Sequence, residues 1–377
     1  MRFGRLAQLA QLARRMSSRP PVLRSFRAGR ACVAVLVMCL VIVAGSAAAA
    51  RPATAPTKLR CSRVASPAGS DTARGTIRSP YRTFRRLVQS LRPGMVGCLR
   101  GGTYGDGATT QAIYRGGRSG KPITITSYPH EEGTIAGPVF ISDTAGYVTI
   151  SHITIEGGTP AGDKKIALEV WGPHFIFKDG VITNHSGGRS GLLIRGDAAV
   201  IRRDKLYDIG TVGSNFGHAH GIYVAYSRNF KIERNWIYDC RSGWGVQLYP
   251  HAVNGIVAQN VIDGCGSGIT ISGNGDLTSS QNRIEHNLIT NSTGLGQFNT
   301  GTAVAGCCAR SPDGNVVLGN VFWGNRDGAF DVWKGQSYVE RGNVTSNPRY
   351  MNRAAKDFRV KGGKARALGL WNGVFAP

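Results

Sequence analysis

The sequence predicts an all-β solenoid in which every coil contributes three short strands, and three observations support this fold class. Glycine is abundant, at 52 of 377 residues, without a collagen-like period, and charged residues make up only 18%, a composition that suits a turn-rich β protein. A strand-and-turn pattern recurs between residues 167 and 345. Within that repeat, no segment between turn residues is long enough to predict a helix.

The chain begins with the pattern of a secretory signal. Residues 1–30 contain eight arginines and no acidic residue, and the apolar run that follows ends in four consecutive alanines. We expect residues 1–50 to be a signal peptide that is cleaved near Ala48 or Ala50, so that the protein is secreted or held at the cell surface. A retained signal anchor is the alternative, because residues 31–50 approach the ~20 apolar or small residues of a membrane span.

The rest of the chain divides into a linker, a solenoid and a tail. We expect residues 51–75 to be a linker, residues 76–360 to form about eight coils and residues 361–377 to form a C-terminal tail or cap. Within residues 79–94, apolar positions at helical spacing predict an amphipathic helix that covers the open end of the core. These apolar positions are Tyr81, Phe84, Val88 and Leu91.

One column of the repeat is marked by an amide or a carboxylate. Each member follows an aliphatic residue and two further residues, and precedes a second β-prone run. Successive members lie 23 to 33 residues apart, and they are Asp179, Asp204, Asn235, Asn260, Asn287, Asn320 and Asn343. Since Asn tolerates the left-handed conformation and stacked amides can hydrogen-bond between coils, we expect a ladder at one turn.

A second column consists of short strands with alternating apolar residues, bounded by Gly, Ser, Asn or Pro. A single coil cannot bury its apolar face, whereas stacked coils can. The strands of this column lie in residues 167–171, 191–196, 221–226, 245–249, 268–272, 301–306 and 329–333.

Six cysteines remain after removal of residues 1–50, and export permits disulfides. We expect Cys61 and Cys98 to form an N-terminal disulfide. Cys240 and Cys265 occupy equivalent positions in consecutive coils, about 4.8 Å apart, so they form either a disulfide or a pair of stacked buried thiols. The adjacent Cys307–Cys308 pair is open to both states in the same way.

Removal of residues 1–50 leaves 38 basic and 22 acidic residues, a net charge of +16. A basic exported protein attracts acidic polysaccharide, another cell-surface polymer or nucleic acid. A general arginine bias without a partner is the alternative, because the arginines are scattered along the chain.

The chain resembles the right-handed parallel β-helix superfamily of pectate lyases and related carbohydrate-active proteins. Three parts carry the resemblance, over about residues 76–360: SPYRTFRRLVQSLRPG followed by GCLRGGTYGD, the coils with an N-x-I pattern, and the tail NPRYMNRAAKDFRVKGGKARALG. The resemblance implies a right-handed helix with a carbohydrate cleft over the strand column that contains GIYV. It does not define the reaction, because this fold carries lyases, hydrolases, epimerases and binding proteins.

Alternation along the GIYV column predicts which side chains face the cleft. Ile222 and Val224 should point inward and Tyr223 outward. Aromatic rings stack on sugars, and Gln and Arg donate hydrogen bonds; an ordinary solvated strand face, with an exposed Glu169–Arg195 pair worth ~0–1 kcal/mol, is the alternative. The exterior stripe contains Glu169, Trp171, Arg195, Tyr223, Gln247, Tyr249, Thr270, Ser272, Ala303, Ala305, Asp331 and Trp333.

Several reaction types of the fold do not suit the sequence. The adjacent Asp pair of polygalacturonase-type hydrolases is missing, and those enzymes need two carboxylates. On the stripe only Glu169 and Asp331 are acidic, and they lie several coils apart, which argues against a calcium site. His218 and His220 form an i, i+2 pair without a third zinc ligand. We therefore expect no metal and no cofactor.

Calcium-independent β-elimination and C5 epimerisation of uronates remain. Both remove a proton next to a carboxylate, which requires a base and a cation. The candidate catalytic residues are Arg195, His218, His220 and Tyr223, and the candidate substrate-binding residues are Glu169, Gln247, Tyr249, His251 and Trp333. If alternation runs back from Ile222, both histidines point inward, so His218 serves equally well in turn packing.

The leading hypothesis is a secreted β-helix lyase of an acidic polysaccharide. We expect a monomer with no nucleic-acid partner, and no membrane insertion once the signal is cleaved. The alternatives are a noncatalytic carbohydrate-binding or cell-surface protein, a uronate C5-epimerase, and a scaffold without a glycan ligand.

Overall fold

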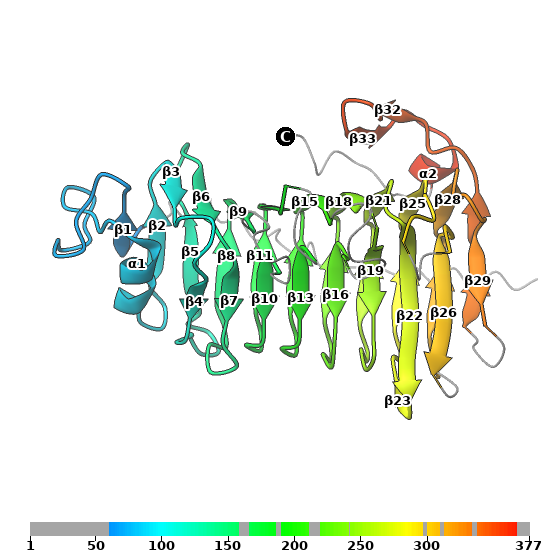
Figure 1. Cartoon of the computed structure of the whole chain (residues 1–377), viewed down its shortest axis with the longest axis horizontal. Helices are drawn as coiled ribbons and strands as arrows, with labels where there is room; N and C mark the ends of the chain where they lie inside the picture. The colour runs from blue at the N-terminus through cyan, green and yellow to red at the C-terminus, as the bar shows by residue number, and fades with distance from the viewer. Residues whose placement is uncertain are drawn as a thin grey trace, which may run out of the picture. The chain divides into compact units, whose positions relative to one another are not determined.

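The computed structural model describes residues 60–157, 166–185, 190–210, 219–240, 242–296, 300–309, 313–333 and 338–367. It confirms the predicted all-β solenoid: three parallel sheets run along it, and successive coils pair strand by strand (Figure 1). The expected signal peptide, residues 1–50, lies outside the described residues. The unit that contains the solenoid spans Lys58–Pro377 and is the one described below.

The sheet formed by the GIYV column is called sheet I. Its ten strands include β23, Leu277–Thr278, which pairs with β22 in the antiparallel sense. The other nine are β4 Gln111–Ile113, β7 Val139–Ile141, β10 Leu168–Val170, β13 Leu192–Ile194, β16 Ile222–Val224, β19 Trp244–Leu248, β22 Ser267–Gly275, β26 Val304–Ala309 and β29 Phe330–Val332.

Sheet II has eleven strands and precedes the amide column along each coil. Its strands are β1 Arg63–Ala65, β2 Val96–Leu99, β5 Ile123–Ser127, β8 Val148–Ser151, β11 Ile176–Lys178, β14 Val200–Arg202, β17 Lys231–Glu233, β20 Ile256–Ala258, β24 Arg283–Glu285, β27 Val316–Leu318 and β30 Val339–Arg341. Because β1 pairs with β2, the sheet begins inside the segment expected to be a linker.

Sheet III has ten strands and follows the amide column. Its strands are β3 Gly102–Tyr104, β6 Gly133–Ala136, β9 Ile153–Glu156, β12 Val181–Thr183, β15 Lys205–Ile209, β18 Trp236–Cys240, β21 Val261–Asp263, β25 Leu288–Thr290, β28 Val321–Trp323 and β31 Val344–Thr345. The strands before Ala167 extend the solenoid ahead of the coils in which the sequence repeat is visible.

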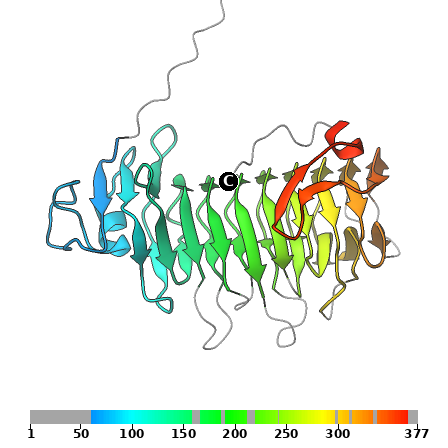
Figure 2. The same ribbon diagram turned by 90° about the horizontal axis from the view of Figure 1, so that it is seen from above.

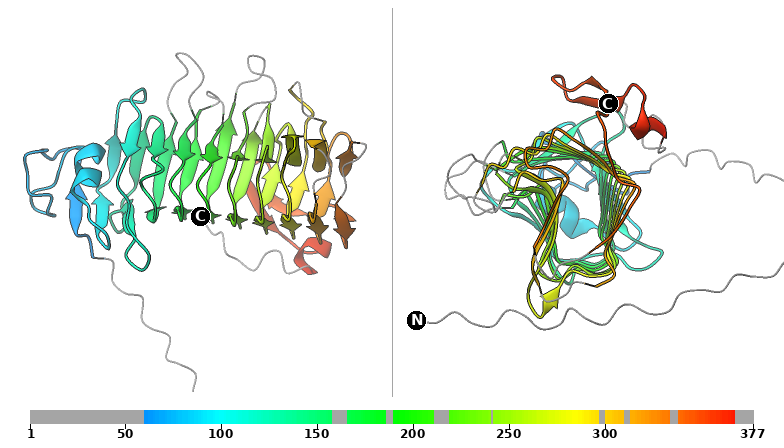
Figure 3. Two further views of the ribbon diagram at one scale, coloured as in Figure 1. Left: turned by 90° about the horizontal axis from the view of Figure 1, so that it is seen from below. Right: turned by 90° about the vertical axis from the view of Figure 1, so that its right-hand side faces the viewer.

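The core fills the space between the three sheets. Alternate residues of each strand point inward, as the fully buried Ile222 and Val224 of β16 do. The predicted N-terminal helix is α1, Phe84–Ser90, and it buries Phe84, Leu87 and Val88. The end-on view of Figure 3 shows the coils superimposed around this core.

The amide ladder is present between sheets II and III, but its first member differs from the prediction. From Asp204 to Asn320, each member's backbone N–H donates to the side-chain oxygen of the member in the next coil, and Asn343 is the last acceptor. In the coil before, Gly180 rather than Asp179 holds the position, because Ile176, not Phe175, pairs with Val200. The ladder residue itself was expected to adopt the left-handed conformation. The residue just before it does so instead, as in Asp179 and Arg203.

The C-terminal segment folds back over the outer face of sheet III (Figure 2). It contains the antiparallel pair β32, Tyr350–Asn352, and β33, Asp357–Val360, followed by α2, Lys364–Ala367. Phe358 packs against the rings of Trp236 and Tyr238. This segment covers a face of sheet III and leaves sheet I uncovered.

The cysteines occur in two states. Cys61 and Cys98 form the expected disulfide, and the adjacent Cys307 and Cys308 are also joined. Cys240 and Cys265 are buried free thiols, the alternative to a disulfide, and burial holds the pKa of Cys265 well above its ordinary value.

Candidate functional site

The register of sheet I fixes which side chains share its outer face. In the row of β16, Tyr223 lies between Leu193 on β13 and Gln247 on β19. The full row, from the N-terminal end, is Ala112, Phe140, Glu169, Leu193, Tyr223, Gln247, Thr270, Ala305 and Asp331. The outward positions predicted for Glu169, Tyr223 and Gln247 agree with this register.

Arg195 lies at the centre of a polar and aromatic cluster on this face. It follows β13 by one residue, and its guanidinium carbon lies 4.9 Å from the ring centroid of Trp171 and 5.7 Å from that of Tyr226. The indole N–H of Trp171 donates to Oε1 of Glu169 at 2.7 Å. Glu169 therefore orients the indole, and the indole and phenol rings hold the cation in place.

Tyr223 lies beside this cation. Burial is the main cause that raises the pKa of its phenol to about 12; the neighbouring phenols of Tyr249 and Tyr226 also raise it, and Arg195 opposes them. At neutral pH the group is therefore a neutral phenol that can donate a proton.

His220 is placed behind the face rather than on it. Its side chain is buried, and its ring edge contacts Tyr223 at 5.6 Å between centroids. The backbone N–H of Trp244 donates to Nδ1 at 3.1 Å, so a neutral His220 carries its proton on Nε2. This arrangement suits a residue that positions Tyr223 better than a base in contact with substrate.

His251 belongs to a different hydrogen-bond network. Its Nδ1 lies 3.0 Å from the carbonyl oxygen of Thr278, and its Nε2 lies 3.2 Å from Nη2 of Arg228. Because a carbonyl only accepts, Nδ1 carries the proton and Nε2 accepts from Arg228. Both ring nitrogens are thus engaged at the turn that follows β19.

One predicted site residue, Trp333, lies away from this cluster. Trp333 is exposed at the far end of sheet I, after β29, four strands along the sheet from the Tyr223 strand β16. His218 lies outside the described residues. The structure thus groups Glu169, Arg195 and Tyr223, with His220 beneath the tyrosine.

An aromatic row extends from the cluster toward the N-terminal end of sheet I, and sequence reasoning missed it. The rings of Tyr114 and Phe140 are 6.4 Å apart, and those of Phe140 and Trp171 are 6.2 Å apart, both edge to face. Tyr114 and Trp171 are exposed. Alternating apolar residues in residues 111–114 and 139–141 could have revealed these strands, but the coils there lack the amide that marks the repeat.

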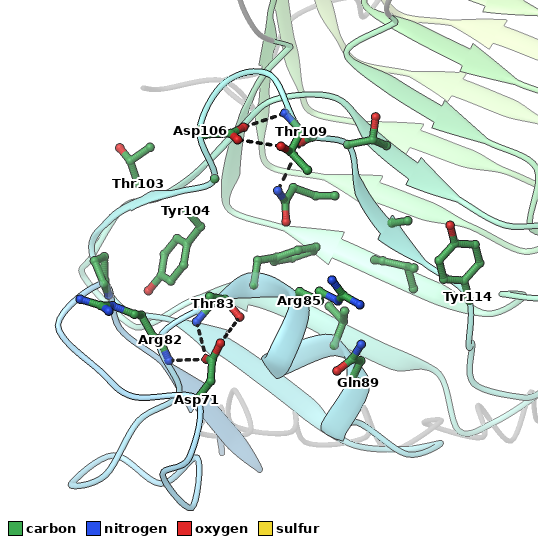
Figure 4. A pocket seen from close by; sticks show the side chains of 18 of the residues that line it. Asp71, Arg82, Thr83, Arg85, Gln89, Thr103, Tyr104, Asp106, Thr109 and Tyr114 are labelled. Atoms are coloured by element: carbon green, nitrogen blue, oxygen red, sulfur yellow. Dashed lines mark hydrogen bonds between the residues drawn. The ribbon is translucent and has the colours of Figure 1, made fainter.

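The row ends at a pocket of about 1220 Å³ between α1 and the connection from β3 to β4 (Figure 4). Phe84, Val88 and Ile113 provide apolar lining, and Arg82, Arg85 and Arg115 provide charge. Tyr114 belongs to both the row and the pocket. The pocket therefore lies at the N-terminal end of the aromatic row.

Two carboxylates also line the pocket, and both already accept hydrogen bonds from neighbouring residues. Asp106 accepts from the hydroxyl and N–H of Thr109 and from the N–H of Ala108, which lowers its pKa to about 2. Asp71 accepts from the hydroxyl and N–H of Thr83 and the N–H of Arg82, bonds that lower its pKa against the opposing effect of burial. Through these hydrogen bonds, Asp71 and Asp106 hold segments of the pocket wall in place.

In the part of the chain that the structure describes, no three His, Cys, Asp or Glu side chains gather as a metal site requires. Across the same residues, no helix has the length and apolar character of a membrane span.

Comparison with known proteins gives a family match. The family described as "Right handed beta helix region" matches residues 133–284 and, in an overlapping match, residues 177–345, which together exceed half of the chain. A curated relative, the uncharacterised protein YwoF of Bacillus subtilis (strain 168), is 28% identical over 137 residues. That match covers 33% of this chain and only 28% of the length of YwoF.

Solved structures share the fold at low sequence identity. Pectate lyase Pel9A has a TM-score of 0.58 and 14% identity, over 82% of this chain and 87% of that one. The XylC complex with xylose has a TM-score of 0.56 and 10% identity, over 75% and 69% of the two chains. An alginate lyase from Paenibacillus sp. str. FPU-7 has a TM-score of 0.53 and 15% identity, over 70% and 94%.

Proposed function

Because the chain belongs to the right-handed β-helix family, we propose that it acts on an acidic polysaccharide laid along the outer face of sheet I. The observation that carries the proposal is the cation of Arg195, held against Trp171 and Tyr226 beside Tyr223. A guanidinium binds a sugar carboxylate, and the rings stack on sugar faces. Export of the chain, expected from residues 1–50, would bring it to such polymers.

The reaction we propose is calcium-independent β-elimination. Arg195 neutralises the uronate carboxylate and stabilises the negative charge that develops when the adjacent carbon loses its proton. The base is the phenolate of Tyr223, which is the minor form at neutral pH because the pKa is about 12, so the rate should rise with pH. The phenolate accepts that proton, a carbon–carbon double bond forms, and the glycosidic C–O bond breaks. The phenol then returns a proton to the departing oxygen, which restores the phenolate. His220 holds the phenol in position.

This proposal takes support from two neighbours in fold, which are named as lyases of pectate and of alginate. Both polymers carry carboxylates, in agreement with a binding site built around arginine. At 14% and 15% identity, these structures share the fold with this chain, and their polymers are the first substrates to assay.

The test is the appearance of unsaturated sugars by ultraviolet absorbance when the protein is incubated with pectate, alginate or a glycosaminoglycan. We expect product with the unaltered protein and none with Tyr223→Phe, which removes one oxygen atom and keeps the ring. Tyr207→Phe, a matched change on the outer face of sheet III, should retain the rate. Product formation that survives Tyr223→Phe would refute the assigned role.

A second candidate function is polysaccharide binding without turnover. The raised pKa of Tyr223, about 12, favours it because little phenolate exists at neutral pH. This alternative predicts saturable binding that Arg195→Ala weakens, and no unsaturated product from any acidic polymer at any pH up to the limit of protein stability.

A further inference from the structure

The positive charge of this protein is concentrated at the N-terminal end of the solenoid. Residues 60–125 contain twelve Arg and Lys and two Asp, a net charge of +10. The 36 basic and 22 acidic residues of residues 60–377 give a net charge of +14. Most of the excess charge of that part of the chain therefore lies in and around α1 and the first strands.

The pocket described above opens within this basic region. Arg82, Arg85 and Arg115 line it, and none of the three forms an ion pair with another described residue. The two lining carboxylates are already bonded to backbone N–H groups and threonine hydroxyls. The free cations of the pocket thus remain available to an anionic ligand.

The placement of these groups favours one end of the pocket. Figure 4 shows Arg85 and Gln89 of α1 toward the end where Tyr114 lies, while Asp71 and Arg82 lie toward the other. Arg115 directly follows Tyr114 in the chain. The exposed ring of Tyr114 gives a surface for the face of a sugar ring, whereas Phe84 and Val88 are buried beneath the pocket.

We propose that this pocket binds an acidic sugar unit of the same chain that lies along sheet I, so that the aromatic row joins two anion-binding positions. The inference rests on the proposed function, because it takes the polymer from Arg195 along Trp171 and Phe140 to Tyr114. Successive strands lie ~4.8 Å apart, so β4 and β13 are separated by three steps, or ~14 Å. A chain must therefore have several sugar units to occupy both positions.

The shared chemistry is an anionic sugar, and its charge comes from a carboxylate or from a sulfate. Arginine forms paired hydrogen bonds with both. The test therefore uses oligouronates and sulfated oligosaccharides of matched length, each as a disaccharide and as an octasaccharide, in calorimetric titrations at physiological salt.

The decisive variant is Arg85→Ala with Arg115→Ala. Its matched control is Arg78→Ala with Arg118→Ala, which removes the same charge from two exposed arginines of the same region that do not line the pocket. We expect the pocket variant to weaken octasaccharide binding about tenfold or more, as the loss of two charge-assisted contacts implies. The control should change it less than about threefold, because exposed charges act weakly through screened solvent.

Arg195→Ala separates this inference from the proposed function. Octasaccharide binding that is weakened by both Arg195→Ala and the pocket variant supports both. Sensitivity to Arg195→Ala alone, with the pocket variant equal to its control, overturns the pocket and leaves the proposed function standing. Sensitivity to the pocket variant alone overturns the site on sheet I, and with it the claim that one chain spans both positions. The absence of binding by any acidic oligosaccharide overturns both.

Discussion

Asp204 is the one carboxylate in the amide ladder from Asp204 to Asn343, and its replacement by Asn should stabilise the protein. In the other coils the amide nitrogen makes two bonds: Nδ2 of Asn235 donates to the carbonyl of Ile201 and to Oδ1 of Asn260. By the same register, Oδ2 of Asp204 faces two acceptors, the carbonyl of Phe177 and Oδ1 of Asn235. That oxygen is buried and has no hydrogen-bond partner.

The environment of Asp204 gives the sign and the size of the effect. Burial is the main cause that raises the pKa of this carboxyl well above its ordinary value; the carboxylate of Asp179 adds to it, and the N–H of Gly180 opposes it. A carboxyl whose pKa is higher in the folded state favours folding fully below its unfolded pKa, near 4, and this contribution is lost as pH rises through the folded value. An unsatisfied buried polar atom costs about 1–3 kcal/mol.

We therefore expect Asp204→Asn to raise the free energy of unfolding at pH 7 by about 2 kcal/mol, which corresponds to roughly 3 °C in Tm for a unit of this length. The gain should shrink toward pH 4, where the protonated carboxyl can itself donate. Thermal unfolding followed by circular dichroism across this pH range measures it. A matched variant, Asn260→Asp, should do the opposite: lower Tm at pH 7 and recover toward pH 4. A gain from Asp204→Asn that is equal at both pH values, or absent, would refute the reasoning.

Three further predictions concern other parts of the molecule. Arg353 pairs with the buried Asp263 at 3.0 Å. Arg353→Ala should destabilise the packing of the C-terminal segment by about 1–2 kcal/mol, less than loss of a fully buried pair would cost, because the arginine is half exposed. Limited proteolysis should then cleave this segment faster. Trp171→Ala should weaken binding of acidic oligosaccharides by about 1–2 kcal/mol in calorimetry, since it removes a stacking face and a cation–π partner; unchanged affinity would count against the site. Cys240 and Cys265 should resist alkylation in the folded protein up to mildly alkaline pH, because burial keeps the Cys265 thiol protonated; rapid native-state labelling would contradict this.

The repeat pattern was enough to predict the solenoid, because a coil of this kind repeats its apolar alternation and its amide turn. The same pattern predicted that Glu169, Tyr223 and Gln247 point outward, as the register shows. It could not show that Leu193 faces out between the Glu169 and Tyr223 strands, because β13 is apolar at inward and outward positions alike. Alternation carries no information where both faces of a strand are apolar.

Other features depend on contacts that a single sequence does not encode in its periodicity. The ladder position moves from Asp179 to Gly180 because of a one-residue shift in pairing, and a glycine leaves no side chain to mark it. The pocket exists only because α1 packs beside β4 (Figure 1). The concentration of charge in residues 60–125 was visible in the sequence, but only the fold shows that it surrounds an opening at the end of sheet I.

The separation between that charge and Arg195 limits how the two can act together. At physiological salt the Debye length is ~8 Å, shorter than the ~14 Å that three strand spacings place between β4 and β13. The basic N-terminal end therefore does little for the local potential at Arg195, and cooperation between them requires a ligand that contacts both. Addition of salt should consequently weaken the binding of octasaccharides far more than the binding of disaccharides, because only the longer chain displaces bound ions at both positions. Equal salt dependence for the two lengths would mean that each binds at a single position.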